Sequence, residues 1–121
     1  MSFKSLRAYE LAFQLAMDIY EVTKSFPKEE RYSLTDQIRR SSRSVCANIA
    51  EGYRKRQYQA HFISKMSDSD MENSETHVWL DFSLNCGYIS KEAYREFMER
   101  NNEIGKLLFF MISNPEKFNS K

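Results

Sequence analysis

The sequence predicts an all-α protein, an up-down-up-down antiparallel four-helix bundle formed by a single domain over residues 1–121. Three observations lead to this fold class. The chain has 121 residues, enough for one domain but not for two. It holds only three glycines and two prolines, too few for the many tight turns of a β-sandwich or an α/β fold. Its nine Phe, seven Tyr and one Trp exclude a disordered chain.

The first helix is expected over residues 5–25, where apolar residues recur at spacings of three and four. Tyr9 and Phe13 belong to one apolar row, and Leu15 belongs to a second row beside it. Pro27 ends the helix, because the residue before a proline is pushed out of the α region. Two apolar rows are more than one bundle core requires. The surplus predicts a partner, and we expect a homo-oligomer.

The second helix is expected to begin near Ser33. Ser33 followed three residues later by Asp36 resembles an N-cap with a capping box. Small side chains in this segment would let a neighbouring helix approach closely, and Gly52 lies near its end. Its apolar face is formed by Leu34, Ile38, Val45 and Ile49.

The third and fourth helices are expected over residues 58–86 and 90–113. Gly87 suits the residue just past a helix end, and Ser90 suits an N-cap. Gly105 inside the fourth helix costs about 1 kcal/mol relative to alanine, which favours close packing there. One face of the third helix carries Phe62, Met66, Ser69, Asn73, Thr76 and Leu80.

No stretch approaches the ~20 apolar residues of a membrane helix, and the N-terminus lacks an apolar signal core. We therefore expect a cytoplasmic protein with no membrane partner. Two cysteines, Cys46 and Cys86, make neither a disulfide framework nor a zinc site. The expectation is two reduced thiols packed on helices.

The sequence does not predict an enzyme. His61 and His77 are 16 residues apart, which fits no short metal motif, and neither belongs to a Glu-x-x-His pair. No glycine-rich phosphate loop occurs. We expect no catalytic residue, no metal and no cofactor. A divalent site that combines His61 with Asp68, or His77 with Glu75, is the weakest of three hypotheses.

The net charge of +1 hides a strong separation of charge. Residues 31–60 carry seven basic and two acidic side chains, a net charge of +5. Residues 61–86 carry one basic and five acidic side chains, a net charge of −4. The net positive segment corresponds to the second helix and its flanks, and the net negative segment corresponds to the third helix.

One basic row lies away from the apolar face of the second helix. Arginine offers a planar fork that fits phosphate oxygens, so this row predicts a nucleic-acid-binding surface for RNA or DNA that is largely independent of base sequence. Tyr53 and Tyr58 flank its end and are expected to stack on bases. The predicted nucleic-acid residues are Arg39, Arg43, Arg54, Lys55 and Arg56.

A second, polar row borders the apolar face. We read it as structural or as a subunit contact, with Arg40 bridging to a carboxylate of the third helix such as Glu72 or Glu75. This row predicts the alternative function, a protein-interaction scaffold whose charges are used at subunit interfaces. Its residues are Gln37, Arg40, Ser44, Asn48 and Glu51, with Glu75 as the partner on the third helix.

Residues 32–52 also resemble a known family. The run from Gln-Ile-Arg-Arg to Asn-Ile-Ala-Glu-Gly is similar to the signature of a bacterial four-helix-bundle family encoded in intervening sequences of 23S ribosomal RNA genes and often labelled ribosomal. The turn at 26–30, Trp79 with Leu80, and the segments 87–89 and 103–108 fit the same family. The resemblance covers nearly the whole chain.

The resemblance implies an α bundle that assembles into a ring or barrel-like homopentamer. It also implies kinship with the accessory variability proteins of diversity-generating retroelements, which bind nucleic acid and a reverse transcriptase through a basic surface. By position, the family signature corresponds here to Gln37, Arg40, Ser44, Asn48, Glu51 and Gly52.

Overall fold

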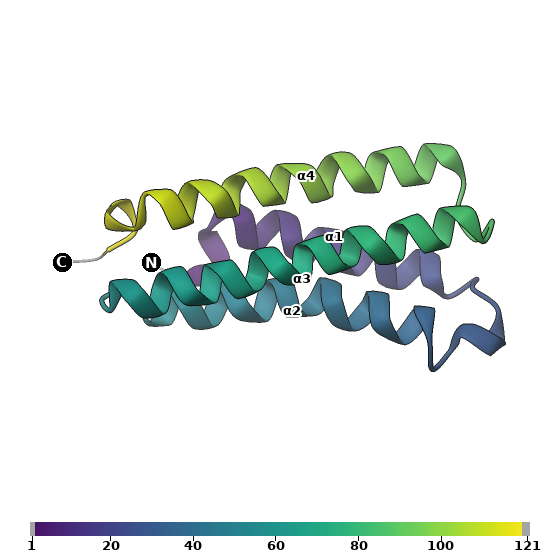
Figure 1. Ribbon diagram of the computed structural model, residues 1–121, viewed down its shortest axis with the longest axis horizontal. Helices are drawn as coiled ribbons and strands as arrows, with labels where there is room; N and C mark the ends of the chain where they lie inside the picture. The colour runs from purple at the N-terminus through teal and green to yellow at the C-terminus, as the bar shows by residue number, and fades with distance from the viewer. Residues whose placement is uncertain (1, 120–121) are drawn as a thin grey trace.

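The computed structural model describes residues 2–119, which form four long helices packed as an antiparallel bundle (Figure 1). Each helix packs against its neighbour in sequence, and α1 also packs against α4. The start of α1 and the end of α4 lie at the same end of the bundle. The predicted fold class is confirmed. The helices are α1 (Arg7–Thr23), α2 (Leu34–Arg54), α3 (Gln59–Asn85) and α4 (Lys91–Ser113), with short 3₁₀ turns η1 (Phe3–Ser5), η2 (Lys28–Glu30) and η3 (Pro115–Lys117).

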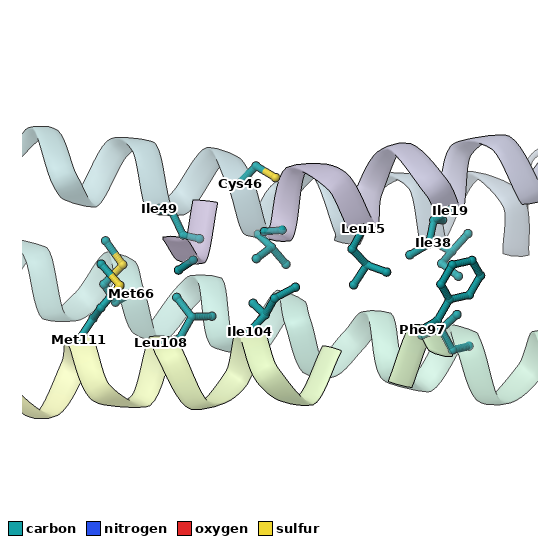
Figure 2. Packing of buried hydrophobic residues seen from close by; sticks show 14 of the residues in the cluster. Leu15, Ile19, Ile38, Cys46, Ile49, Met66, Phe97, Ile104, Leu108 and Met111 are labelled. Atoms are coloured by element: carbon teal, nitrogen blue, oxygen red, sulfur yellow. The ribbon is translucent and has the colours of Figure 1, made fainter. Parts of the chain in front are cut away.

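The core runs the length of the bundle between the four helices (Figure 2). Near one end, Phe97 of α4 lies against aliphatic side chains of α1 and α2, and near the other end Met66 and Met111 lie close together. The predicted apolar face of α2 is fully buried, as is the predicted face of α3. Among residues 2–119, no helix has the length and apolar character that crossing a bilayer requires.

Helix α3 contributes polar side chains to this core, and each finds a partner. Asn73 and Asn101 exchange hydrogen bonds: the side-chain amide of each donates to the backbone carbonyl of the other, at 2.9 Å in both directions. Ser69 donates to the Val45 carbonyl of α2 at 2.8 Å. The hydroxyls of Ser41 and Thr76 lie 2.8 Å apart. Because a buried polar group without a partner is costly, these bonds fix how α3 sits against α2 and α4.

Ser33 is the N-cap residue of α2, as expected, but the expected capping box is wrong: within residues 2–119 the Ser33 side chain makes no capping hydrogen bond. Instead the Glu30 carboxylate accepts from the Leu34 backbone N–H at 3.2 Å and from the Tyr88 hydroxyl at 2.8 Å. Glu30 therefore places a negative charge at the positive end of α2 and ties this turn to the α3–α4 turn. The hydrogen bond to this carboxylate raises the pKa of Tyr88 to about 12, because it favours the protonated hydroxyl, and burial and the negative charge of Glu30 act in the same direction.

The signals at the next turn act as predicted. Ser90 caps α4 by accepting from the Ala93 N–H at 3.0 Å. Gly87 adopts a φ of +78°, in the left-handed region where other residues are strained. One expectation fails here, because Cys86 is exposed at the end of α3, whereas only Cys46 is packed in the interior.

Two helical glycines differ in the space around them. A Cβ on Gly52 would lie 2.8 Å from Lys65 Cβ, so α2 and α3 approach too closely here for any side chain. A Cβ on Gly105 would meet Asn73 Nδ2 at 3.5 Å, an ordinary contact. The close packing expected at Gly105 is therefore absent, and Gly52 is the position where packing requires glycine.

We predict opposite effects of alanine at these two positions. Gly105→Ala removes the helix penalty of glycine without a clash and should raise the free energy of unfolding by about 0.5–1 kcal/mol. Gly52→Ala gains the same helix propensity but forces α2 and α3 apart, and should lower that free energy by about 1–2 kcal/mol. Urea unfolding followed by circular dichroism measures both. A destabilised Gly105→Ala protein would contradict this account of the α3–α4 contact.

Candidate nucleic-acid interface

The predicted basic row lies on the solvent side of α2. Arg43 and Arg54 are exposed and Arg39 is half-buried. At a rise of about 1.5 Å per residue, the row from Arg39 to Arg54 extends over about 22 Å. Within residues 2–119, none of these three side chains lies within ion-pair distance of a carboxylate. Their charges remain available to an external anion.

The first two arginines of the row are held in place by α1. Arg39 Nε donates to the Thr23 hydroxyl at 2.8 Å, and the hydroxyl in turn donates to the Tyr20 carbonyl at 2.9 Å. The Arg39 guanidinium lies 4.6 Å from the centroid of the Tyr20 ring, and the Arg43 guanidinium lies 5.5 Å from the same centroid. One ring therefore orders two cations without neutralising either.

Arg40 points to the other side, toward α3. It contacts Glu75 at 2.5 Å and Glu72 at 3.5 Å, and the hydrogen bond to Glu75 is the main cause of its raised pKa. Trp79 Nε1 donates to the same Glu75 carboxylate at 3.1 Å. This is the bridge expected for Arg40, and it pairs the charge of one basic residue of α2.

The rest of the polar row makes local contacts on this side of α2. Glu51 pairs with Lys65 of α3 at 2.8 Å. The Asn48 side chain donates to the Ser44 carbonyl at 3.0 Å, within its own helix. Gln37 is half-buried in a hollow that Trp79 also lines.

The basic cluster at the end of α2 is only partly free. Arg54 and Lys55 are exposed and, with His61 and Lys65, line a hollow of about 370 Å³. Arg56 is folded back: its guanidinium lies 4.0 Å from the Tyr53 ring centroid, and its Nη1 donates to the Tyr53 carbonyl.

The expectation that Tyr53 stacks on bases is wrong, because Tyr53 is only 6% exposed and packs in the interior. In the sequence, Tyr53 and Tyr58 both lie near the charged end of α2. Only the packing of α2 against the other helices determines that Tyr53 is buried and Tyr58 is exposed. Tyr58 is 55% exposed and is the aromatic ring at this end that remains accessible.

An apolar groove lies between α1 and α2, next to the basic row. Its volume is about 400 Å³. Phe13 and Met17 of α1 are 49% and 42% exposed on it. The surplus apolar surface expected on the first helix is thus found, at the junction with α2. The groove is lined by Phe3, Tyr9, Phe13, Ala16, Met17, Arg43, Cys46, Ala47 and Ala50.

A second apolar feature lies on α3 and was missed in the sequence analysis. Met71, Val78 and Phe82 are 70%, 46% and 54% exposed. Their spacings of seven and four place them on one stripe of the helix, opposite its core face. The signal was present in the sequence as this spacing, but apolar residues on two sides of a helix do not reveal which side faces the core.

The histidines form no metal centre in the part of the chain that the structure describes. No group of three or more His, Cys, Asp or Glu side chains is placed to hold a metal ion there. His77 lies 3.6 Å from Asp81 of the same helix, and His61 is exposed beside Tyr58.

Comparisons with known proteins agree with the fold. The sequence model of the family described as 23S rRNA-intervening sequence protein matches residues 4–109. A crystal structure of a protein of unknown function from the S23 ribosomal protein family of Bacteroides thetaiotaomicron is 30% identical, with a TM-score of 0.78. The similarity covers 88% of this chain and 95% of that protein. No curated protein matches the chain.

The apolar groove allows a prediction for Cys46, which lines it but is only 8% exposed. Burial raises the pKa of the Cys46 thiol from 9.0 to about 11. At pH 8 the reactive thiolate of Cys46 is then roughly 100-fold scarcer than for an ordinary thiol, and its fraction reaches one half only near pH 11. We expect iodoacetamide to alkylate Cys46 at least ~50-fold more slowly than exposed Cys86, as measured by peptide mass spectrometry.

Denaturant supplies the control for this measurement, since both cysteines should then react at similar rates. Equal rates in the native protein would mean that the groove opens readily enough to expose Cys46.

Proposed function

The chain belongs to the 23S rRNA-intervening sequence protein family, and from this premise we propose that it is a non-enzymatic, homo-oligomeric protein that binds nucleic acid through α2. RNA is the first candidate, because the family description names a ribosomal RNA. The cytoplasm, where ribosomal RNA is found, is the proposed location. Binding through guanidinium groups on the outer face of a helix is expected to contact phosphates rather than base edges, and so to be largely independent of sequence.

The observation that carries the proposal is the positive charge of α2 that is not paired with a carboxylate of residues 2–119. Of the basic residues on this helix, Arg40 is paired with carboxylates of α3. Arg39, Arg43 and Arg54 have no acidic partner among residues 2–119 and lie along one side of the helix. A row of unpaired cations about 22 Å long spans several phosphates of a nucleic-acid strand.

The proposed assembly rests on the two apolar surfaces. The groove between α1 and α2 is concave, and the stripe of Met71, Val78 and Phe82 on α3 is a separate, exposed surface. We infer that the stripe of one copy fills the groove of the next. Two different surfaces in contact make a head-to-tail interface, which closes into a ring when the rotation permits. The ring would repeat the basic row around the assembly and raise affinity through avidity.

The resemblance adds a reverse transcriptase as a proposed protein partner. The scaffold function is the second candidate, because Glu51 and Lys65 and the Arg40 network show that charges of α2 do pair with carboxylates and amines of other helices. It differs from the first candidate in one respect: it requires that Arg39 and Arg43 hold subunits together.

We predict that Arg39→Gln with Arg43→Gln weakens binding of a single-stranded RNA at least ~10-fold at 100 mM salt. Each lost phosphate contact should also lower the slope of log affinity against log salt by about 0.7–0.9, so the double variant should lose about 1.5. Fluorescence anisotropy titrations between 50 and 200 mM salt give both quantities. Arg54→Gln with Lys55→Gln should produce a similar loss.

Arg95→Gln with Lys106→Gln is the matched control, because it removes two exposed cations from α4, a helix that is not adjacent to α2 in the bundle. It should leave affinity within about twofold. The proposal fails if the native protein shows no binding at ~50 mM salt, where phosphate contacts are strong. If the arginine variants dissociate the oligomer instead, the scaffold function replaces it.

The head-to-tail interface predicts an unusual mixing result. Phe13→Glu and Val78→Glu should each reduce the native assembly to monomers, because each buries a charge in an apolar contact. An equimolar mixture retains one intact groove and one intact stripe, so it should form dimers and nothing larger. Light scattering after size-exclusion chromatography measures the masses. A mixture that stays monomeric would contradict the pairing of these two surfaces.

A further inference from the structure

A groove of about 450 Å³ runs along the first half of α2 and gathers four arginines. Arg31 precedes the helix, and Arg39, Arg40 and Arg43 follow on it. One carboxylate, that of Asp36, also lines the groove. Like charges repel one another, so a groove in which basic side chains outnumber acidic ones attracts an anion.

Four arginines and one aspartate line the groove, but Arg40 is already paired with Glu72 and Glu75. The other charged side chains of the lining have a net charge of +2. Arg31, Arg39 and Arg43 have no carboxylate partner among residues 2–119, and Asp36 offsets one of these three charges. A charge of +2 matches a dianion better than the single charge of a phosphodiester.

The donors of the groove are ordered but unused. Arg39 is held through its Nε by Thr23 and by the face of Tyr20, and its two terminal nitrogens make no hydrogen bond within the described part of the chain. Arg43 lies against the same ring and makes no hydrogen bond to residues 2–119. A guanidinium fork fits the oxygens of a phosphate, and ordering it in advance reduces the entropy lost on binding.

Thr35 supplies an independent observation. It lines the groove and is only 7% exposed, yet its hydroxyl has no hydrogen-bond partner among residues 2–119. A buried hydroxyl without a partner is costly, and Thr35 is the second residue of α2, so no earlier turn of this helix offers a carbonyl to its hydroxyl. Because Oγ1 is itself buried, a rotation about Cα–Cβ is needed to turn it into the groove, where it would donate to a ligand oxygen.

We propose that this groove binds the dianionic phosphate of a phosphomonoester, with Arg31, Arg39 and Arg43 as the cations and Thr35 as a hydroxyl donor. The inference goes beyond the proposed function, with which it shares Arg39 and Arg43: that function needs only the diester backbone, whereas this site distinguishes a phosphate group at a chain end. The same chemistry is offered by a terminal phosphate of a nucleic acid and by a small free phosphomonoester.

The first arm of the test compares two ten-nucleotide RNAs of one sequence, with a 5′-phosphate or a 5′-hydroxyl, at pH 7.5 and 100 mM salt. We expect the 5′-phosphate to bind at least ~5-fold more tightly. This preference should vanish in Arg31→Gln and in Thr35→Val, and should shrink at pH 5.5, where a phosphomonoester loses its second charge. Arg54→Gln with Lys55→Gln should weaken both RNAs equally and keep the preference.

The second arm uses phenyl phosphate, dimethyl phosphate and sulfate as small probes, measured by calorimetry. Binding of phenyl phosphate above that of the other two, without a preference between the RNAs, supports the site and assigns it to a small ligand. Thr35→Val serves as the structural control: removing an unpartnered hydroxyl should not lower the melting temperature, so its binding loss would reflect the ligand.

The proposal is overturned if the two RNAs bind within twofold of each other and phenyl phosphate binds no better than dimethyl phosphate. RNA binding with no monoester preference in either arm would leave the nucleic-acid function standing and remove this site. Phenyl phosphate binding without RNA binding would support this site and remove the nucleic-acid function.

Discussion

The reciprocal hydrogen bonds between Asn73 and Asn101 are the constraint on which the rest of the bundle depends. Both side chains are at most 4% exposed, so either amide left unpaired would be strongly destabilising. The pair forms only when α3 and α4 meet in one register. Ser69, which donates to the Val45 carbonyl, extends the same constraint to α2. Apolar side chains alone would tolerate some sliding and rotation, whereas these bonds do not.

The fixed rotation of α2 decides where its charges go. With its apolar face toward the core, one polar flank meets α3 and the other meets α1. On the α3 side Arg40 finds Glu75. On the α1 side Arg39 and Arg43 find Tyr20, a ring that orders cations but carries no charge. The +5 and −4 segments of the chain therefore cancel only in part, and the uncancelled part lies along one edge of α2.

The basic edge and the apolar groove are neighbours, and Arg43 and Ala47 line both the apolar groove and the arginine groove. Small residues on α2 leave the apolar groove open, since a larger side chain at Ala47 or Ala50 would occupy it. Subunit contact and anion binding would then take place side by side, so that each copy added to an assembly would bring another basic edge close to the previous one. Affinity for a long polyanion would grow with the size of the assembly.

The sequence by itself determined the four helices, nearly to the residue, and the core faces of α2 and α3. Helix ends and the 3.6-residue period are local properties, read from Pro27, Gly87, Ser90 and the spacing of apolar residues. It also distinguished the two polar rows of α2. The sequence could not show which row remains without an acidic partner, because that depends on whether a carboxylate or an aromatic ring lies opposite it on the neighbouring helix.

The tertiary structure decided the features that require two elements to meet. Packing between helices buried Tyr53, left Cys86 exposed and moved the capping hydrogen bond of α2 from Ser33 to Glu30, which also reaches Tyr88 across the turns. It also made Gly52, and not Gly105, the crowded glycine. The physical reason is common to all of these: a local pattern specifies which face of a helix is apolar, but only the distance and rotation of its neighbours specify what each side chain touches.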